Sequence, residues 1–208
     1  MIVIGLVGTP AGGKSTVARL LQELGATWIN ADLIAREVLD RADVQKRVID
    51  HFGPDVADNA GLVDRKKLAA RVFGDDDLSR RALRYLEGLV HPLTRQVILQ
   101  RMRDVEHQHP TSTKPVGLSE SVVVLDIPLL FEAGWDVSCD QIWCVDADHE
   151  IRAQRAADRG WDSSELKRRE ANQLAIDAKK RLSSVVVDNN GSPEQLNATI
   201  TALWSSLR

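Results

Sequence analysis

The feature that most constrains this chain is a glycine-rich loop placed between a strand pattern and a helix pattern. Residues 8–15 read Gly-Thr-Pro-Ala-Gly-Gly-Lys-Ser, which matches G-x-x-x-x-G-K-S/T. An apolar, β-branched run (residues 2–7) precedes the loop, and a helical pattern from Ser15 to Leu24 follows it and ends at Gly25. The order strand, loop, helix predicts a backbone cradle for the phosphate groups of a nucleotide.

The residue types of this loop suit phosphate binding. Glycines let the backbone curl with its N–H groups pointing inward, and the following helix N-terminus favours negative charge. Lys14 is expected to contact the β- and γ-phosphates, and the Ser15 hydroxyl to bind Mg²⁺. The nucleotide-binding residues expected from the loop are Gly8, Ala11, Gly12, Gly13, Lys14, Ser15 and Thr16, with Thr16 at the α-phosphate.

Short apolar runs alternate with helical patterns along the chain, which is typical of a parallel sheet with crossover helices. The five strands expected lie at residues 2–7, 26–30, 121–127, 141–145 and 185–187. The run at 121–127 is continuous Val and Leu, as in a strand buried on both faces. A final helix is expected after Ser192 as N-cap, with Pro193 in its first turn and Gln195 three residues beyond the cap. The fold class predicted is α/β, a P-loop NTPase-type five-stranded parallel sheet with flanking helices.

The second and third strands are separated by about 90 residues that read almost wholly as helices. A crossover needs only about a dozen residues, so the surplus predicts a helical insertion. Helix breaks are expected at Gly53, Gly61, Gly74 and Pro92, and a mobile surface loop at residues 110–120. We therefore expect one domain over residues 1–208, with a nucleotide core at 1–30, 121–150 and 183–208. The helical insertion is expected at about 33–120 and a helical lid at about 151–180.

Composition narrows the class of protein. Of the 208 residues, 43% are hydrophobic and 27% charged, which argues against a disordered chain. A net charge of −3 argues against a protein that coats nucleic acid. No apolar run reaches the roughly 18 residues of a membrane helix, and no signal peptide is visible, so a cytoplasmic protein is expected. Cys139 and Cys144 are expected to be buried, reduced thiols rather than a disulfide.

Asp126 ends the apolar run that forms the expected third strand. A hydrophobic strand that delivers one acid at its C-terminal end is the usual form of a second magnesium-side carboxylate in such proteins. The alternative is an ordinary strand-end Asp in a turn before Pro128. We favour a contact with Mg²⁺, directly or through water.

A small kinase fits the remaining features better than a switch or a motor. The guanine-reading pattern Asn-Lys-x-Asp is absent, and a nucleic-acid motor would carry a basic track. Arg152, Arg155 and Arg159 are spaced i, i+3, i+7, so we expect them to share one helix face and to close over the γ-phosphate. A solvated helix face is the alternative, and Arg168 and Arg169 fit either reading.

Asp32 follows the second expected strand, at the sheet edge where ligands of open α/β sheets bind. A carboxylate there can orient an acceptor hydroxyl toward the γ-phosphate and take its proton late. An N-cap for a helix starting at Leu33 is an equally good interpretation from residue type alone.

Nearly the whole chain resembles the dephospho-CoA kinase family. The resemblance is carried by the opening GLVG and GGKSTVA, by Asn30-Ala31-Asp32, by His91-Pro92, and by the block at 125–132, LDIPLLFE. Asp64-Arg65, Gln173 and residues 188–191, DNNG, also fit.

The resemblance implies transfer of the γ-phosphate of ATP, with Mg²⁺, to the 3′-hydroxyl of the dephospho-CoA ribose. It implies catalytic roles for Asp32, Lys14, Arg155 and Arg159, and an adenine-side place for Asn189. Substrate contacts are implied for Asp32, Arg65, His91 and Arg169, although packing explains His91 equally well. ATP and dephospho-CoA are the partners expected, with no nucleic acid and no membrane, and the chain is expected to be a monomer or small homo-oligomer.

The chain departs from the family pattern Gly-Gly-Ile-Gly-Ser-Gly-Lys-Ser at Pro10, which removes a donor, and at Ala11. The family also has an Ala-Asp pair before its last strand, where this chain has Ser183-Ser184. Two alternatives stay open: another small P-loop kinase acting on a nucleoside or nucleotide, and an ATP-binding regulatory protein without turnover.

Overall fold

A computed structural model describes residues 1–74, 76–107 and 121–207. The chain forms two compact units, one built from residues 1–30 and the residues from 102 onward, the other from residues 31–101. The loop expected at 110–120 lies outside the described residues. None of the described helices has the length and apolarity that crossing a membrane requires.

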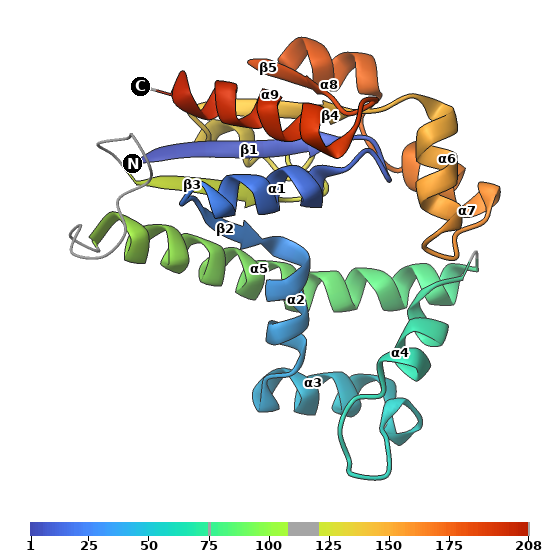
Figure 1. The fold of residues 1–208 in the computed structure, drawn as a ribbon. Coiled ribbons are helices and arrows are strands. Elements are labelled where there is room, and N and C mark those ends of the chain that lie inside the picture. The colour runs from blue at the N-terminus through green and yellow to red at the C-terminus, as the bar shows by residue number, and fades with distance from the viewer. Residues whose placement is uncertain (75, 108–120, 208) are drawn as a thin grey trace. The chain divides into compact units, whose positions relative to one another are not determined.

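The first unit contains a five-stranded parallel sheet in the order β2-β3-β1-β4-β5, which confirms the predicted fold class (Figure 1). The strands are β1 (Ile2–Gly8), β2 (Thr27–Asn30), β3 (Val122–Asp126), β4 (Gln141–Asp146) and β5 (Val185–Asp188). Every residue of β1 and β3 is buried, as expected of central strands covered on both faces. Parallel pairing brings the carboxyl ends of the strands to one edge, where Gly8 pairs with Val145 and Asn30 with Asp126.

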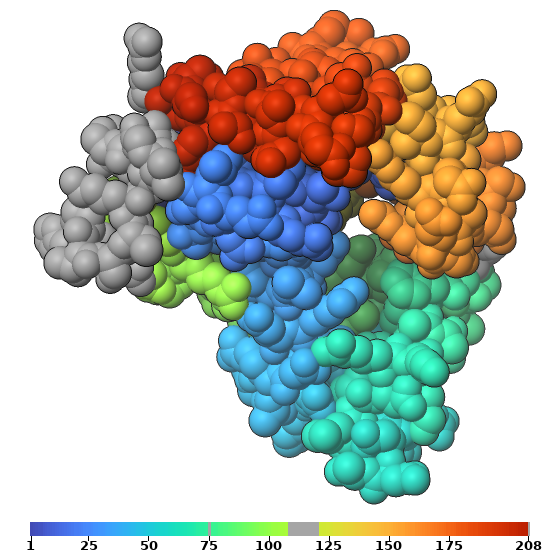
Figure 2. Space-filling view, in the orientation of Figure 1, coloured from blue at the N-terminus to red at the C-terminus, as the bar shows by residue number. Residues whose placement is uncertain are grey.

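Helices cover this sheet on its two faces. Helix α1 (Lys14–Glu23) packs against α9 (Pro193–Ser205), and both contribute to a core with Ile4, Leu6 and Trp143. Their surfaces lie side by side in blue and red in Figure 2. Helix α8 (Ile176–Leu182) contacts β1 and β4, and α6 (His149–Ala157) contacts α7 (Ser163–Ala171). A short 3₁₀ turn, η2 (Asp136–Ser138), precedes β4.

Local signals explain how α9 begins. The Ser192 side chain accepts from the Gln195 N–H, and the Gln195 side chain accepts from the Ser192 N–H. This reciprocal capping box, with Pro193 in the first turn, satisfies two helix-end donors and confirms the start predicted for this helix. The two cysteines are free thiols, Cys144 buried and Cys139 partly exposed.

The second unit is helical, as predicted. It comprises α2 (Ala31–Leu39), α3 (Ala42–Phe52), η1 (Pro54–Val56), α4 (Arg65–Val72) and most of α5 (Asp77–His107). The helices are interrupted around Gly53, Gly61 and Gly74, as expected.

The break expected at Pro92 is wrong, because the 31-residue helix α5 contains this proline and continues beyond it to His107. Proline removes one backbone hydrogen bond of a helix and crowds the preceding turn. Leu89 and Val90 before the proline, and Thr94 and Ile98 after it, are all buried on α5. We attribute the continuous helix to this burial, which offsets the local cost.

Candidate active site

The glycine-rich loop leaves β1 at Gly8 and enters α1 at Lys14. Gly13 precedes the helix with φ 107°, a left-handed conformation that favours glycine. A Cβ on Gly13 would lie 2.0 Å from the Asn189 amide nitrogen, and a Cβ on Gly8 would lie 2.1 Å from the Val145 carbonyl oxygen. The loop therefore requires glycine at both positions for steric reasons.

Ala11 is the one described non-glycine residue with positive φ, at 60°. This conformation costs a β-carbon roughly 1 kcal/mol. The Ala11 side chain is buried in a small apolar cluster with Ala156 of α6, Leu166 of α7 and the partly buried Trp161. The alanine that replaces the family's usual glycine therefore has a packing role, because its methyl group contacts the helices expected to form the lid.

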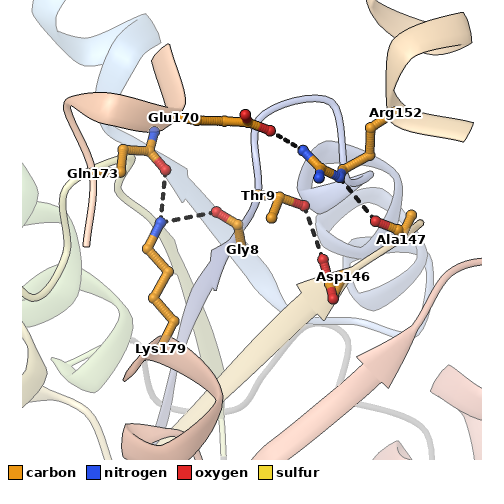
Figure 3. Close-up of polar contacts among 8 residues, drawn as sticks. All are labelled: Gly8, Thr9, Asp146, Ala147, Arg152, Glu170, Gln173 and Lys179. Carbon is orange, nitrogen blue, oxygen red and sulfur yellow. Dashed lines mark hydrogen bonds and ion pairs between the residues drawn. The ribbon is translucent and has the colours of Figure 1, made fainter. Parts of the chain in front are cut away.

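Three side chains from outside the loop bind its outward carbonyls. The Gly12 oxygen accepts from Asn189 Nδ2 at 2.8 Å and from Arg155 at 3.3 Å. The Gly8 oxygen accepts from Lys179 Nζ at 3.0 Å (Figure 3). Asn189 is buried and its own backbone N–H donates to Asp146. In a trans peptide the next N–H points opposite to the carbonyl, so these contacts favour N–H groups that face the cradle.

Asp126 lies at the carboxyl edge of the sheet, as predicted from the sequence. Its carboxylate is 3.4 Å from Lys14 Nζ and accepts from Asn30 Nδ2 at 3.4 Å. The Asp126 residue is only 4% exposed, so this negative charge is held next to the charged end of the loop lysine. The structure thus brings together the cradle, its lysine and the predicted magnesium-side acid.

These residues suit Mg²⁺ of the kind that nucleotides carry. Among the described residues, no group of three His, Cys, Asp or Glu side chains could hold a metal by itself. Mg²⁺ in phosphoryl-transfer sites commonly has one or two protein ligands and takes the rest from phosphates and water. Ser15 is exposed in the first turn of α1, and with Asp126 it offers such a partial ligand set.

The lid arginines do not share one helix face, which corrects the sequence prediction. Arg152 and Arg155 lie on α6, whereas this helix ends at Ala157 and Arg159 falls in the turn before Gly160, which has φ 76°. Arg155 donates to the carbonyls of Gly12 and Asn189. Arg152 donates to the Ala147 carbonyl and pairs with Glu170 of α7 (Figure 3).

Two of the other predicted arginines lie near the ring of Trp161. The Arg169 guanidinium lies 4.2 Å from the centroid of the Trp161 ring, and the Arg159 guanidinium lies 5.6 Å from it. Arg169 also donates to Glu165 at 2.7 Å. Arg155 is therefore the predicted lid arginine that contacts the phosphate-binding loop directly, while Arg159 and Arg169 gather around the tryptophan.

Sequence reasoning missed a second set of contacts on the loop. The Thr9 hydroxyl donates to Asp146 at 3.2 Å, and Lys180 pairs with the same carboxylate at 2.6 Å, which raises the pKa of Lys180. Lys179 is 2% exposed, and burial lowers its pKa. In the sequence, Lys179 and Lys180 read as the charged end of a surface helix, so no signal separated the buried lysine from its neighbour.

In the helical unit, Asp32 is exposed and is the second residue of α2. The helix begins at Ala31, so the interpretation of Asp32 as its N-cap is wrong. A carboxylate in the first turn still favours the helix through its dipole. Asp32 lies two residues after Asn30, which is the last residue of β2.

The same unit contains a pocket of about 270 Å³ with mainly apolar walls. Phe73 lies at this pocket and is 70% exposed. Both predicted substrate residues of this unit, Arg65 and His91, line the pocket. Arg65 pairs with Asp40 at 2.7 Å and donates to the Arg36 carbonyl. The wall residues are Ala35, Arg36, Leu39, Arg65, Leu68, Ala69, Val72, Phe73, Leu86, Glu87, Val90 and His91.

Comparison with known proteins gives one consistent family. The model of a family described as dephospho-CoA kinase matches residues 2–195. A dephospho-CoA kinase of Rhodopirellula baltica is 36% identical over 205 residues, which cover 99% of this chain and 90% of that protein. A Thermus thermophilus crystal structure has a TM-score of 0.76 at 31% identity and covers 100% of this chain and 98% of that one. A dephospho-CoA kinase from Campylobacter jejuni, 21% identical, shares the fold with a TM-score of 0.67 over 97% of this chain and 95% of its own.

Proposed function

The chain belongs to the dephospho-CoA kinase family, and we propose that it transfers the γ-phosphoryl group of ATP to the 3′-hydroxyl of the ribose of dephospho-CoA. The products are ADP and coenzyme A, and the reaction is the last step of coenzyme A synthesis. The observation that carries this proposal, together with the family, is the Lys14–Asp126 pair beside the glycine-rich loop at the edge of the sheet.

On the donor side, the loop N–H groups and Lys14 bind the phosphates of ATP. Transfer breaks the bond between the γ-phosphorus and the bridging oxygen of ADP and forms a bond to the acceptor oxygen. Negative charge develops on the phosphoryl oxygens in a loose transition state, where fixed positive groups stabilise it. Lys14 and Arg155 supply that charge, since Lys14 ends the loop at the start of α1 and Arg155 donates to the Gly12 carbonyl. Arg159 joins them when the lid closes.

Mg²⁺, bound through Ser15 and Asp126, would neutralise part of the phosphate charge. Thr16, exposed in the first turn of α1, donates to the α-phosphate. Asn189 is assigned to the nucleotide site through its hydrogen bond to Gly12 rather than through a base contact.

On the acceptor side, Asp32 orients the 3′-hydroxyl and accepts its proton late in the transfer. A loose transition state requires little deprotonation of the acceptor hydroxyl, so orientation is the larger part of this role. Arg65 and His91 flank the apolar pocket, which suits a ligand that has both an uncharged arm and phosphate groups. Arg169 contributes a further cation for the substrate phosphates from the lid.

Release of ADP, coupled to a reporter reaction, tests the function directly. We expect ADP to form with dephospho-CoA and not with adenosine, AMP or other nucleosides, and the product to carry phosphate on the 3′-oxygen. Turnover on a nucleoside instead would favour another small P-loop kinase. ATP binding without turnover on any acceptor would favour a regulatory protein.

A cytoplasmic location and a monomer or small homo-oligomer remain part of the proposal, as does the absence of nucleic-acid and membrane partners. Size-exclusion chromatography with light scattering, with and without ATP, measures the oligomeric state. Nucleic acid or anionic vesicles added to the turnover assay are expected to leave the rate unchanged.

A further inference from the structure

Lys179 is a buried charge that the phosphoryl-transfer scheme above does not use. It lies on α8 and is 2% exposed. Its ammonium donates to the Gly8 carbonyl at 3.0 Å and to Gln173 Oε1 at 2.6 Å (Figure 3). Both acceptors are neutral, and burial lowers the pKa of Lys179 by more than the nearby Glu132 carboxylate raises it, so burying this ammonium costs free energy. The position of these two acceptors gives the cost a functional explanation.

The first acceptor belongs to the peptide that opens the phosphate-binding loop. The Gly8 carbonyl and the Thr9 N–H share one trans peptide and point in opposite directions. An ammonium that holds the carbonyl on the outside therefore fixes the direction of the Thr9 N–H. Gly8 also packs closely against β4, because a Cβ at this position would lie 2.1 Å from the Val145 carbonyl oxygen. Lys179 and β4 together determine how the loop begins.

The second acceptor belongs to the segment that leaves the lid. Gln173 follows the last residue of α7, Ala171, by two positions and leads into α8. A pocket of about 220 Å³ separates this segment from the tip of the loop, and its wall includes Thr9, Pro10 and Lys179. Figure 3 shows the lysine reaching the loop and the lid segment at once. One ammonium thus connects the first loop carbonyl to the end of the lid.

We propose that Lys179 is a positioning residue for ATP: it aims the first peptide of the phosphate-binding loop and ties that loop to the lid through Gln173. The proposal rests on the donor half of the function above and adds a residue that contacts neither substrate.

The test compares Lys179→Met, which keeps the length of the side chain, with Lys179→Arg, which keeps a charged donor. Lys167→Met is the control, because it makes the same change on the exposed surface of α7. We expect Lys179→Met to weaken ATP binding, measured by calorimetry without acceptor, by about tenfold or more, as for loss of a hydrogen bond to a charged group. Lys179→Arg should recover most of the affinity, and Lys167→Met should match the parent.

Two further readouts separate positioning from a merely structural role. The KM for dephospho-CoA and the Tm of Lys179→Met should both stay close to the parent values, since the loss of two hydrogen bonds is offset by removal of the desolvation cost of the buried ammonium. Gln173→Leu cuts only the link to the lid, so we expect a lower kcat with nearly unchanged ATP affinity.

Parent-like ATP binding in Lys179→Met would overturn the proposal, and so would unfolding of that variant or a parent-like kcat in Gln173→Leu. Because ATP binding is measured without acceptor, these outcomes remain distinct from a parent enzyme that fails to phosphorylate dephospho-CoA.

Discussion

The two compact units of this chain present two different kinds of binding site. In the first unit, the phosphate-binding loop is held by hydrogen bonds from Lys179, Asn189 and Arg155, all of them inside that unit. In the second unit, the pocket is walled mainly by aliphatic side chains, and an exposed Phe73 lies at it. The loop, which we propose binds the donor, is therefore held by directed hydrogen bonds, whereas the pocket, which we propose binds the acceptor, offers apolar area that a ligand can cover.

The difference agrees with the ligands that we propose for the two sites. Phosphate recognition needs N–H groups in fixed directions, and only a braced backbone supplies them. An uncharged, flexible ligand arm gains free energy from buried apolar area, for which shape matters more than single hydrogen bonds.

The largest effect is expected where the acceptor hydroxyl must be oriented. Asp32→Ala should lower kcat by at least about 10²-fold, a typical loss for a group that assists proton transfer and orientation, and should leave ATP affinity intact. Steady-state kinetics and ATP calorimetry on the same sample measure both quantities. Unchanged turnover would remove Asp32 from the mechanism.

On the donor side, Asn189→Ala removes the buried amide that holds Gly12. The Gly12 carbonyl keeps Arg155 as its side-chain donor, so we expect ATP affinity to fall about three- to tenfold, the range for one lost neutral hydrogen bond. Asn197→Ala, on the exposed surface of α9, is the control and should bind ATP as the parent does. A rise in the KM for dephospho-CoA instead would contradict the separation of the two sites.

On the acceptor side, Phe73→Ala tests the apolar pocket without a large risk to folding, since the ring is already exposed. Covering part of such a side chain is worth about 1 kcal/mol, so the KM for dephospho-CoA should rise roughly fivefold while that for ATP stays the same. Leu78→Ala is a matched control because Leu78, which is 68% exposed in the same unit, is not part of the pocket wall. Equal effects of the two substitutions would argue against the pocket as the acceptor site.

The smallest effect is expected at Ala11. Ala11→Gly relieves the left-handed backbone by roughly 1 kcal/mol and loses a methyl contact of similar size, so thermal stability should change little. The contact with Ala156 and Leu166 disappears, and we expect the KM for ATP to rise about two- to threefold through a more open lid. A lower KM in this variant would mean that the methyl group hinders the loop rather than anchoring the lid.

The sequence pattern predicted a structural element correctly where the residues that stabilise the element are also close together in the sequence. The five strands, the loop before α1 and the capped start of α9 follow from apolar runs, glycines and a Ser-x-x-Gln signal within a few residues of one another. The sequence pattern gave a wrong prediction at Pro92, where a helix break was expected, and at Arg159, which was expected on the same helix face as Arg152 and Arg155. The burial of the side chains around Pro92 offset its local cost, and a turn after Ala157 separated Arg159 from its expected helix face.

The sequence by itself determined the sheet, the glycine loop with Lys14 and Ser15, and membership of the family, because each of these is written in contiguous residues. Only the tertiary structure decided that Lys179, Asn189 and Arg155 hold the loop. These residues follow Gly8 and Gly12 by more than 140 positions, and only strand pairing brings them to the same edge of the sheet. The sequence does not distinguish a buried lysine from an exposed one, because the packing around α8 decides which lysine is buried.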